Sequence, residues 1–325
     1  MQGRYNNIAI KAIAAAVPEQ IVNNEGYEKE LGKKRLSKHI RMTGVERRRK
    51  LSEHQNASDL AICAADKVLE YVMWRRDDIQ ALIYVTQVPD MEKPATAFLI
   101  QKKLGIGKNC IVFDVNLGCS GFVAGMQIIA GILHNSGGKG LLLIADGRYG
   151  EERKIEDQIL FGDAGCAIAV EVEEAHELYY MQESDGTRYD VIHKQYGQST
   201  IMNGNAVFAF TLYEVSQSII KARELFGISE SDIDYYVFHQ GQKMIIDNLA
   251  EICDVPKEKL LYSIEEYGNT IGSSIPLTLC HNRELLQKKD KLSLFMSGFG
   301  VGLSWGSVFV TICPETVLGI YCLDL

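Results

Sequence analysis

A cysteine, a histidine and an asparagine stand at three breaks in apolar segments, where their side chains could act together on a thioester. Cys119 separates a strand-like run from a run rich in glycine and alanine, in "FDVNLGCSGFVAGM". His239 closes the apolar run "YYVF", and Asn269 lies in the glycine-flanked break "YGNTIGSS". A thiol at a strand-to-helix break lies beside unpaired backbone N–H groups and the positive end of a helix dipole, and both favour the thiolate. We therefore expect Cys119 to be a nucleophile.

Each of the three residues also has a purely structural explanation. A cysteine can pack at a crowded bend, a histidine can close a buried strand, and an asparagine after glycine is typical of a turn. Their coincidence favours chemistry, because a neutral imidazole and an amide can both donate hydrogen bonds to a carbonyl oxygen that gains negative charge.

The elements that must position these residues occur twice along the chain. Each copy has an Asp-Ile opening, a buried strand, an amphipathic helix, a break into a small-residue helix and a closing strand. Asp78 and Asp232, which open the copies, are 154 residues apart, and the two breaks are 150 apart. This offset predicts two duplicated halves, residues 1–175 with the cysteine and residues 176–325 with the histidine and asparagine. Alternating strands and helices predict an α/β fold with mainly parallel strands.

Composition narrows the class of protein. The 325 residues are 46% hydrophobic and 23% charged, which is typical of a globular protein, and the net charge of -8 argues against nucleic-acid binding. The first residues do not resemble a signal peptide, and no apolar run is long enough to span a bilayer, so we expect a cytoplasmic protein without membrane contact. The eight cysteines lack a Cys-x-x-Cys pair and the seven histidines are scattered, which predicts no structural metal site.

Papain-like proteases offer an alternative, because Cys, His and Asn occur in the same order with broadly similar spacing. The context "NLGCSGF" differs from the protease signature Cys-Gly-Ser-Cys-Trp/Tyr, and a papain-like fold does not predict the duplication. A glycine-rich turn at 298–306 follows the second closing strand. The duplication places this turn close to both breaks, where its amides could serve as oxyanion donors.

An ordered set of motifs resembles the β-ketoacyl-acyl-carrier-protein synthase III group of thiolase-fold condensing enzymes over essentially the whole chain. The resemblance implies a five-layered α-β-α-β-α fold built from two duplicated halves, a homodimer, and no metal or dissociable redox cofactor. The motifs are "RMTGVERRR" (41–49), "TQVPD" with "ATAFLIQKKLGI" (86–106), "FDVNLGCSGF" (113–122), "FGDAGCA" (161–167), "HQG" (239–241), "YGNTIGSSIP" (267–276) and "GFGVGLSWG" (298–306).

The resemblance also implies a two-step reaction. Cys119 would take an acyl group from an acyl-CoA or an acyl-carrier protein. His239 and Asn269 would then hold the carbonyl of a malonyl thioester while decarboxylation generates the attacking carbanion. The backbone N–H groups of Cys119 and of the turn at Gly300 and Val301 would form the oxyanion hole. In the same pocket, the side chain of Phe299 would wall the site beside the departing carboxylate.

Departures from the family pattern concern substrate binding. Arg41 matches a family residue that lies near the phosphates of coenzyme A. The tryptophan that many members carry shortly before it, which stacks on the adenine of coenzyme A, is missing here. Arg148 is a candidate second contact to coenzyme A. Gln242 stands where an asparagine usually contacts the pantetheine arm, and Lys243 is a candidate docking residue for an acidic carrier protein. Lys93 lies near the position of a hydrophobic residue that often lines the acyl pocket across the dimer. These changes favour a specialised relative over the housekeeping fatty-acid initiator.

Two rival functions keep the same fold. One is acyl transfer to an oxygen or nitrogen acceptor without decarboxylation, which the same three residues could support. The other is a non-catalytic partner subunit, against which the intact Cys-His-Asn set argues.

Overall fold

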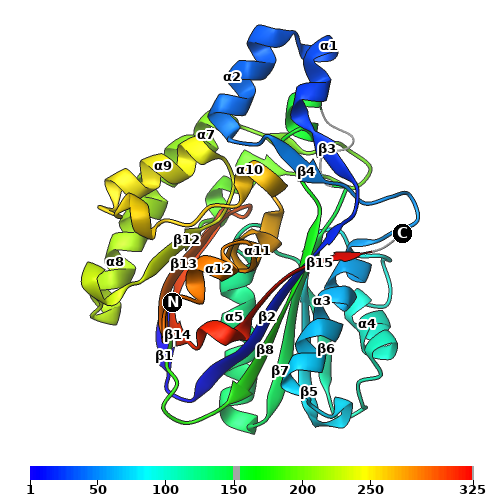
Figure 1. The fold of residues 1–325 in the computed structure, drawn as a ribbon, viewed down its shortest axis with the longest axis vertical. Helices are drawn as coiled ribbons and strands as arrows, with labels where there is room; N and C mark the ends of the chain where they lie inside the picture. Colours follow the sequence, from blue (N-terminus) through cyan, green and yellow to red (C-terminus); the bar gives the residue numbers. More distant parts are fainter. Residues whose placement is uncertain (149–153, 324–325) are drawn as a thin grey trace.

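Two mixed β-sheets, with helices between them and on their outer faces, organise the chain (Figure 1). The structure, a computed structural model, describes residues 1–148 and 154–323. The first sheet has the order β15-β2-β8-β7-β5-β6, and its strands are β2 (Ile8–Pro18), β5 (Ile79–Val85), β6 (Ile111–Val115), β7 (Lys139–Asp146), β8 (Ala164–Val172) and β15 (Val317–Leu323). The second has the order β1-β9-β14-β13-β12, and its strands are β1 (Gln2–Tyr5), β9 (Leu178–Ser184), β12 (Tyr235–Phe238), β13 (Leu292–Gly300) and β14 (Ser304–Ile312).

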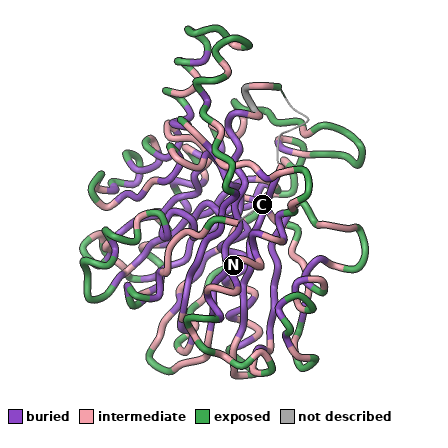
Figure 2. The backbone as a smooth tube through the Cα atoms, turned by 45° about the vertical axis from the view of Figure 1, so that its right-hand side comes forward, coloured by how far each residue is buried: buried purple, intermediate pink, exposed green. Residues whose placement is uncertain are grey.

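Helices form the remaining three layers. The outer face of the first sheet packs against α3 (Ala57–Val72) and α4 (Thr96–Leu104). Between the sheets lie α5 (Gly121–Ser136) and α11 (Ser274–His281), each in contact with strands of both sheets. The outer face of the second sheet packs against α8 (Ser216–Phe226) and α9 (Lys243–Ile252). The predicted five-layered α-β-α-β-α arrangement is confirmed, and Figure 2 shows that burial is greatest along the sheets and the central helices.

Local sequence signals explain where these helices begin and end. A capping box starts α3, because the side chains of Asn56 and Asp59 satisfy each other's backbone N–H groups. The left-handed Gly105 ends α4. In contrast, α5 is apolar around most of its circumference, which suits a helix enclosed between two sheets.

The two sheets share a pattern of mixed strand pairing. Among the described strands of these sheets, antiparallel pairings outnumber parallel ones, so the predicted mainly parallel arrangement is wrong. In the first sheet, β7 pairs with β5 in parallel and with β8 in antiparallel orientation. In the second sheet, β13 likewise pairs with β12 in parallel and with β14 in antiparallel orientation. The terminal strands depart from a simple division, because β1 pairs with β9 in the second sheet and β15 pairs with β2 in the first. The division into residues 1–175 and 176–325, which falls between β8 and β9, therefore stays a prediction.

A helical projection rises from this layered body. It consists of α1 (Glu28–Leu31) and α2 (Lys33–Thr43), which stand at the top of Figure 1. Short two-stranded sheets, β3 (Ile21–Asn23) with β4 (Arg47–Arg49) and β10 (Ile192–His193) with β11 (Ile201–Met202), lie outside the two main sheets. Across 1–148 and 154–323, no helix combines the length and apolarity needed to cross a membrane.

The remaining helices are short and lie in the connections between these elements. They are α6 (Ile155–Gln158), α7 (Gly204–Phe210), α10 (Ile264–Tyr267) and α12 (Arg283–Leu286).

Candidate active site

One pocket brings together the three side chains that sequence reasoning singled out. Cys119, His239 and Asn269 all line it, together with Phe299 and the turn at 300–301. Its volume is about 640 Å³, counting the space open to solvent. Cys119 comes from the first half of the chain and the other residues come from the second, so the site exists only where the two halves meet.

Cys119 sits in the bend between β6 and α5. A close approach by the end of β13 shapes its surroundings, because a Cβ on Gly300 would lie 2.8 Å from Cys119 Cβ and 3.2 Å from its Sγ. Only glycine leaves the thiol room while bringing this part of the backbone beside it. Ser120, at the start of α5, is fixed to β14 by a 2.6 Å hydrogen bond between its Oγ and Ser304 Oγ.

The protonation state of the cysteine differs from the expectation. Burial, together with the nearby carboxylate of Asp146, raises the pKa of the Cys119 thiol to about 12. Loss of hydration therefore opposes the bias toward the thiolate that was expected from the helix N-terminus. At this raised pKa the side chain is mainly a thiol at neutral pH, so an attack by its sulfur would require loss of the proton.

His239 follows β12 and is held on two sides. Its backbone N–H donates to Ser297 O at 2.8 Å, and its Nδ1 lies 2.8 Å from Ser274 Oγ. Burial lowers the pKa of His239 to about 3, so the ring is neutral at physiological pH. A serine hydroxyl can donate or accept, so Ser274 can hold either neutral tautomer and leave Nε2 as acceptor or donor. The ring of Phe299 stands nearly perpendicular to the imidazole at 5.5 Å.

Asn269 is fixed to the first half of the chain by its backbone. Its N–H donates to Leu160 O at 2.9 Å, and its carbonyl accepts from Gly162 N–H at 3.1 Å. Its side-chain Oδ1 accepts from Ile271 N–H at 2.9 Å, which leaves the Nδ2 protons as the donors for a ligand. Ile271 has a left-handed φ of 54°, which is unusual for a β-branched residue and places strain at the site.

An apolar wall completes the pocket, and sequence reasoning missed it. The wall includes Val207 and Phe210 of α7, with Thr211 at the start of the π-helical turn Thr211–Val215. Phe210 packs edge-on against Trp305 at 5.1 Å. The only sequence signal was an apolar run, "AVFAF", which is equally typical of a core helix.

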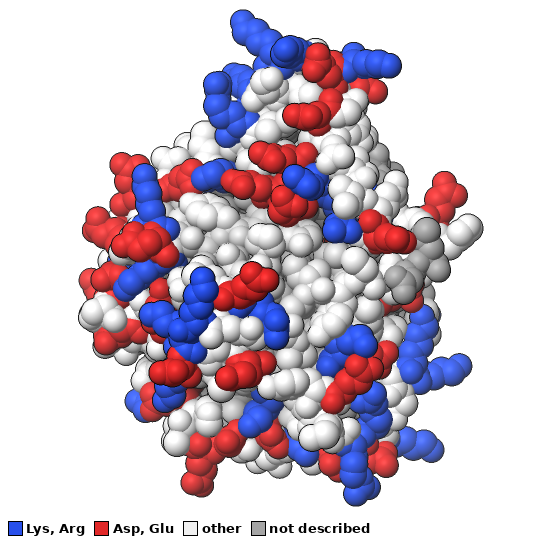
Figure 3. Space-filling view, viewed as in Figure 1, with Lys and Arg blue, Asp and Glu red and all other residues white. Residues whose placement is uncertain are grey.

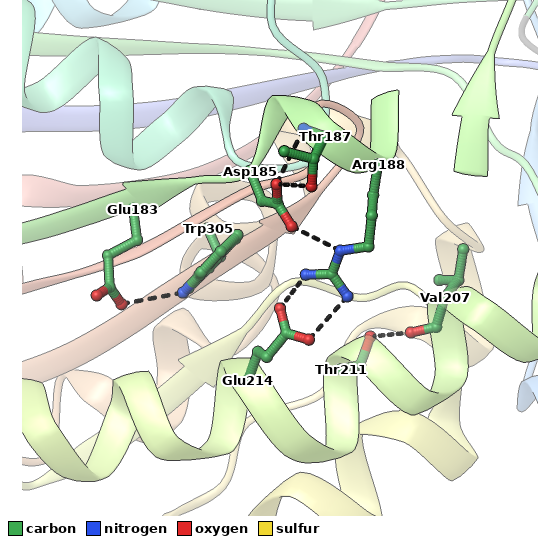
Figure 4. Close-up of polar contacts among 8 residues, drawn as sticks. All are labelled: Glu183, Asp185, Thr187, Arg188, Val207, Thr211, Glu214 and Trp305. Atoms are coloured by element: carbon green, nitrogen blue, oxygen red, sulfur yellow. Dashed lines mark hydrogen bonds and ion pairs between the residues drawn. The ribbon is translucent and has the colours of Figure 1, made fainter. Parts of the chain in front are cut away.

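An ion-pair network holds this wall in place. Figure 4 shows Arg188 between Asp185 and Glu214, with both Nη atoms directed at the Glu214 carboxylate. Arg188 Nε donates to Asp185 Oδ2 at 2.7 Å, and its guanidinium lies over the Phe210 ring at 5.7 Å. Arg188 therefore ties the segment after β9 to the π-helical turn.

The other predicted binding residues divide into two groups. Gln242 lines the pocket, and Lys243 follows it directly at the start of α9, where its Nζ pairs with Asp247 at 3.0 Å. Arg41 is exposed in the last turn of α2, outside the pocket lining. Arg148 also lies outside it, because its guanidinium donates to the backbone carbonyls of residues 52 and 55.

Two family models match parts of the chain. Residues 113–186 match the model of 3-oxoacyl-[acyl-carrier-protein (ACP)] synthase III, and residues 224–312 match the model of its C-terminal region. The first match contains Cys119, and the second contains His239, Asn269 and Gly300.

Individual relatives cover nearly the whole chain. A β-ketoacyl-[acyl-carrier-protein] synthase III from Bacillus pumilus is 31% identical over 308 residues, which cover 93% of this chain and 98% of the relative. A relative of the same name from Clostridium perfringens is 32% identical over 315 residues, covering 90% and 95%. The solved structure of a 3-oxoacyl-(acyl-carrier protein) synthase from Burkholderia xenovorans superposes with a TM-score of 0.95 at 28% identity, over 99% of both chains. The predicted thiolase-like fold is confirmed.

Proposed function

Because the chain belongs to the β-ketoacyl-acyl-carrier-protein synthase III family, we propose that it condenses an acyl group held on Cys119 with a malonyl thioester. The observation that carries this proposal is that a thiol, a neutral imidazole and an amide line the same pocket. The family is one of condensing acyltransferases, and the particular acyl chain is not assigned.

In the first step, Cys119 Sγ attacks the carbonyl carbon of an acyl thioester from coenzyme A or a carrier protein. The thiol proton passes to neutral His239 Nε2 and then to the departing thiolate of the donor, so that the donor leaves as a free thiol. The backbone N–H groups of Cys119, Gly300 and Val301 stabilise the negative oxygen of the tetrahedral intermediate.

In the second step, His239 Nε2–H and Asn269 Nδ2 donate to the carbonyl oxygen of the malonyl thioester. The bond to the carboxylate breaks, carbon dioxide leaves, and the electron pair forms an enolate that these donors stabilise. The apolar Phe299 ring disfavours the charged carboxylate and favours uncharged carbon dioxide. The enolate carbon then attacks the carbonyl carbon of the acyl thioester, and the C–S bond to Cys119 breaks. The departing Cys119 thiolate takes a proton from solvent, which restores the thiol for the next cycle.

We also propose that the chain forms a homodimer and receives its substrates from an acyl-carrier protein. Support for the dimer comes from β6, which is the last strand of its sheet and carries an Ile111 side chain that is 53% exposed. A second copy could pair with this edge and cover its apolar residues. A specialised substrate, as the sequence departures indicate, stays a prediction.

The test is to incubate the protein with acyl-CoA and acyl-carrier substrates and to measure the mass of the Cys119 peptide. We expect an acyl adduct on Cys119, and release of labelled carbon dioxide when malonyl-carrier protein is added. An adduct without carbon dioxide release would instead indicate transfer to an oxygen or nitrogen acceptor. Full condensing activity in Cys119→Ser, with no adduct trapped, would refute the proposal.

A further inference from the structure

A stripe of positive charge follows one face of α2. Lys34, Lys38 and Arg41 are spaced by four and three residues, which places them on one side of the helix, and all three are exposed. The opposite side carries the buried Leu36 and Thr43. α2 contains no acidic residue, and the three cations form no ion pair with any residue in the described part of the chain. We call Lys34, Lys38 and Arg41 the α2 stripe.

The α2 stripe begins close to a residue that lines the pocket. α2 ends at Gly44 and packs against α9, where a Cβ on Gly44 would lie 2.6 Å from Lys243 Cβ. Lys243 directly follows Gln242, which lines the pocket. From this point the stripe extends outward for about 10 Å along the projection. Figure 3 shows Lys and Arg side chains at the outer end of the projection, with Asp and Glu side chains among them.

The charges near the pocket entrance are not equivalent. Lys243 Nζ is already paired with Asp247, and it also lies 4.6 Å from the centre of the Tyr262 ring. Its charge is therefore partly neutralised within the chain. The α2 stripe, in contrast, presents unneutralised cations on a protein whose net charge is -8. Such a patch attracts and orients an acidic partner against the repulsion of the rest of the surface.

We propose that the α2 stripe docks an acidic carrier protein while the thioester arm of that carrier enters the Cys119 pocket. This inference rests on the proposed function and names the surface that its macromolecular substrate uses. A carrier protein fits better than the nucleotide of coenzyme A for two reasons. The cations are spread along about two helical turns, which matches a row of carboxylates on a protein surface. Moreover, α2 has no Phe, Tyr or Trp on which an adenine ring could stack.

The test compares two double charge reversals. Lys34→Glu with Lys38→Glu removes most of the α2 stripe. Lys288→Glu with Lys291→Glu makes the same change in net charge at two exposed lysines in the segment before β13, away from α2. Binding of a fluorescently labelled acyl-carrier protein is measured by anisotropy, and loading of Cys119 is measured with acyl-carrier and acyl-CoA donors.

We expect the α2 variant to weaken carrier binding and to raise KM for the carrier substrate by about tenfold, with kcat unchanged. Loading from acyl-CoA should stay within about twofold, and the control variant should behave as wild type. Equal effects in both variants, or no effect in the α2 variant, would overturn the inference. An equal loss with acyl-CoA would also overturn it, because the stripe would then bind nucleotide phosphates.

Failure of the proposed function gives a different result. In that case the wild-type protein would form no Cys119 adduct with any thioester, whereas the anisotropy measurement would still report whether the carrier docks on α2.

Discussion

The two bends that meet in the pocket occupy equivalent places in the repeated order of elements but are built differently. The first bend joins a regular strand, β6, to the long helix α5, and it carries Cys119. The second is preceded by no regular strand, and Asn269 is held by backbone hydrogen bonds to Leu160 and Gly162 of the first half. Cys119 thus lies between two regular elements of its own half, whereas the backbone of Asn269 is held by hydrogen bonds to the opposite half.

The two bends contribute different chemical groups to the pocket. Burial makes the Cys119 thiol harder to ionise and the His239 ring harder to protonate, so both are neutral at rest. In the proposed reaction, the first bend supplies the group that forms a covalent bond, and the second supplies a donor that stabilises developing negative charge. The two bends should therefore fail in opposite ways when they are altered.

The largest effect is expected from Cys119→Ala. Without the thiol, no acyl adduct forms and condensation should fall by about a thousandfold or more. Carbon dioxide release from the malonyl thioester should continue, because His239 and Asn269 remain. Mass spectrometry of the protein and counting of labelled carbon dioxide measure the two steps separately. Cys322→Ala, at an exposed position outside the pocket, is the control and should behave as wild type.

The second prediction is a variant that keeps the loading of Cys119 but loses decarboxylation. In Asn269→Ala the amide donor is lost, so carbon dioxide release and condensation should fall by about 10² to 10³. Loading of Cys119 from acyl-CoA should change by no more than about threefold. If loading and decarboxylation fell together, the functional division between the bends would be wrong.

The third prediction concerns the reactivity of the two kinds of thiol. Because the pKa of Cys119 is about 12, only a small fraction is thiolate at pH 7.5. Iodoacetamide should therefore modify exposed Cys322 at least about 100-fold faster than Cys119. The Cys119 rate should rise about tenfold per pH unit up to pH 10, as peptide mass spectrometry would record. Equal rates at pH 7.5 would contradict the raised pKa.

The smallest effect is expected on stability in acid. The folded pKa of His239, about 3, lies below its ordinary value, so the unfolded chain takes up a proton near pH 6.5 that the folded chain refuses. This residue should therefore lower the free energy of unfolding by about 1 kcal/mol between pH 7.5 and 5.5. Urea unfolding at both pH values should show a smaller loss for His239→Gln. An unchanged loss would mean that His239 does not titrate in this way.

Much of this architecture could be predicted from the sequence. The break at Cys119, the end of α4 at Gly105 and the turn after β13 follow from apolar periodicity and from glycines at the ends of elements. The convergence of Cys119, His239 and Asn269 in one pocket followed from the repeated order of elements together with the resemblance to a family, since no local pattern links residues so far apart.

Features that depend on distant packing could not be predicted. The local sequence favours a lowered pKa for Cys119, but its pKa is raised. The layers of the fold around Cys119 remove the water that would stabilise the thiolate. The wall formed by Phe210 and Arg188 depends on contacts between the segment after β9 and the π-helical turn, which no periodicity reveals. Likewise, Arg148 does not line the pocket, because its guanidinium donates to the backbone carbonyls of residues 52 and 55.

The strands near the two ends of the described chain each pair in the sheet formed mainly by the other half, β1 with β9 and β15 with β2. This pairing has a consequence for folding during synthesis of the chain. β15 completes the edge of the sheet that contains most of the N-terminal strands, and it leaves the ribosome after every other strand. The first sheet therefore cannot finish pairing beside β2 until the whole catalytic apparatus has been translated. Closing such distant contacts carries a large entropic cost and slows folding. The first sheet and the second half of the chain must therefore complete their folding together.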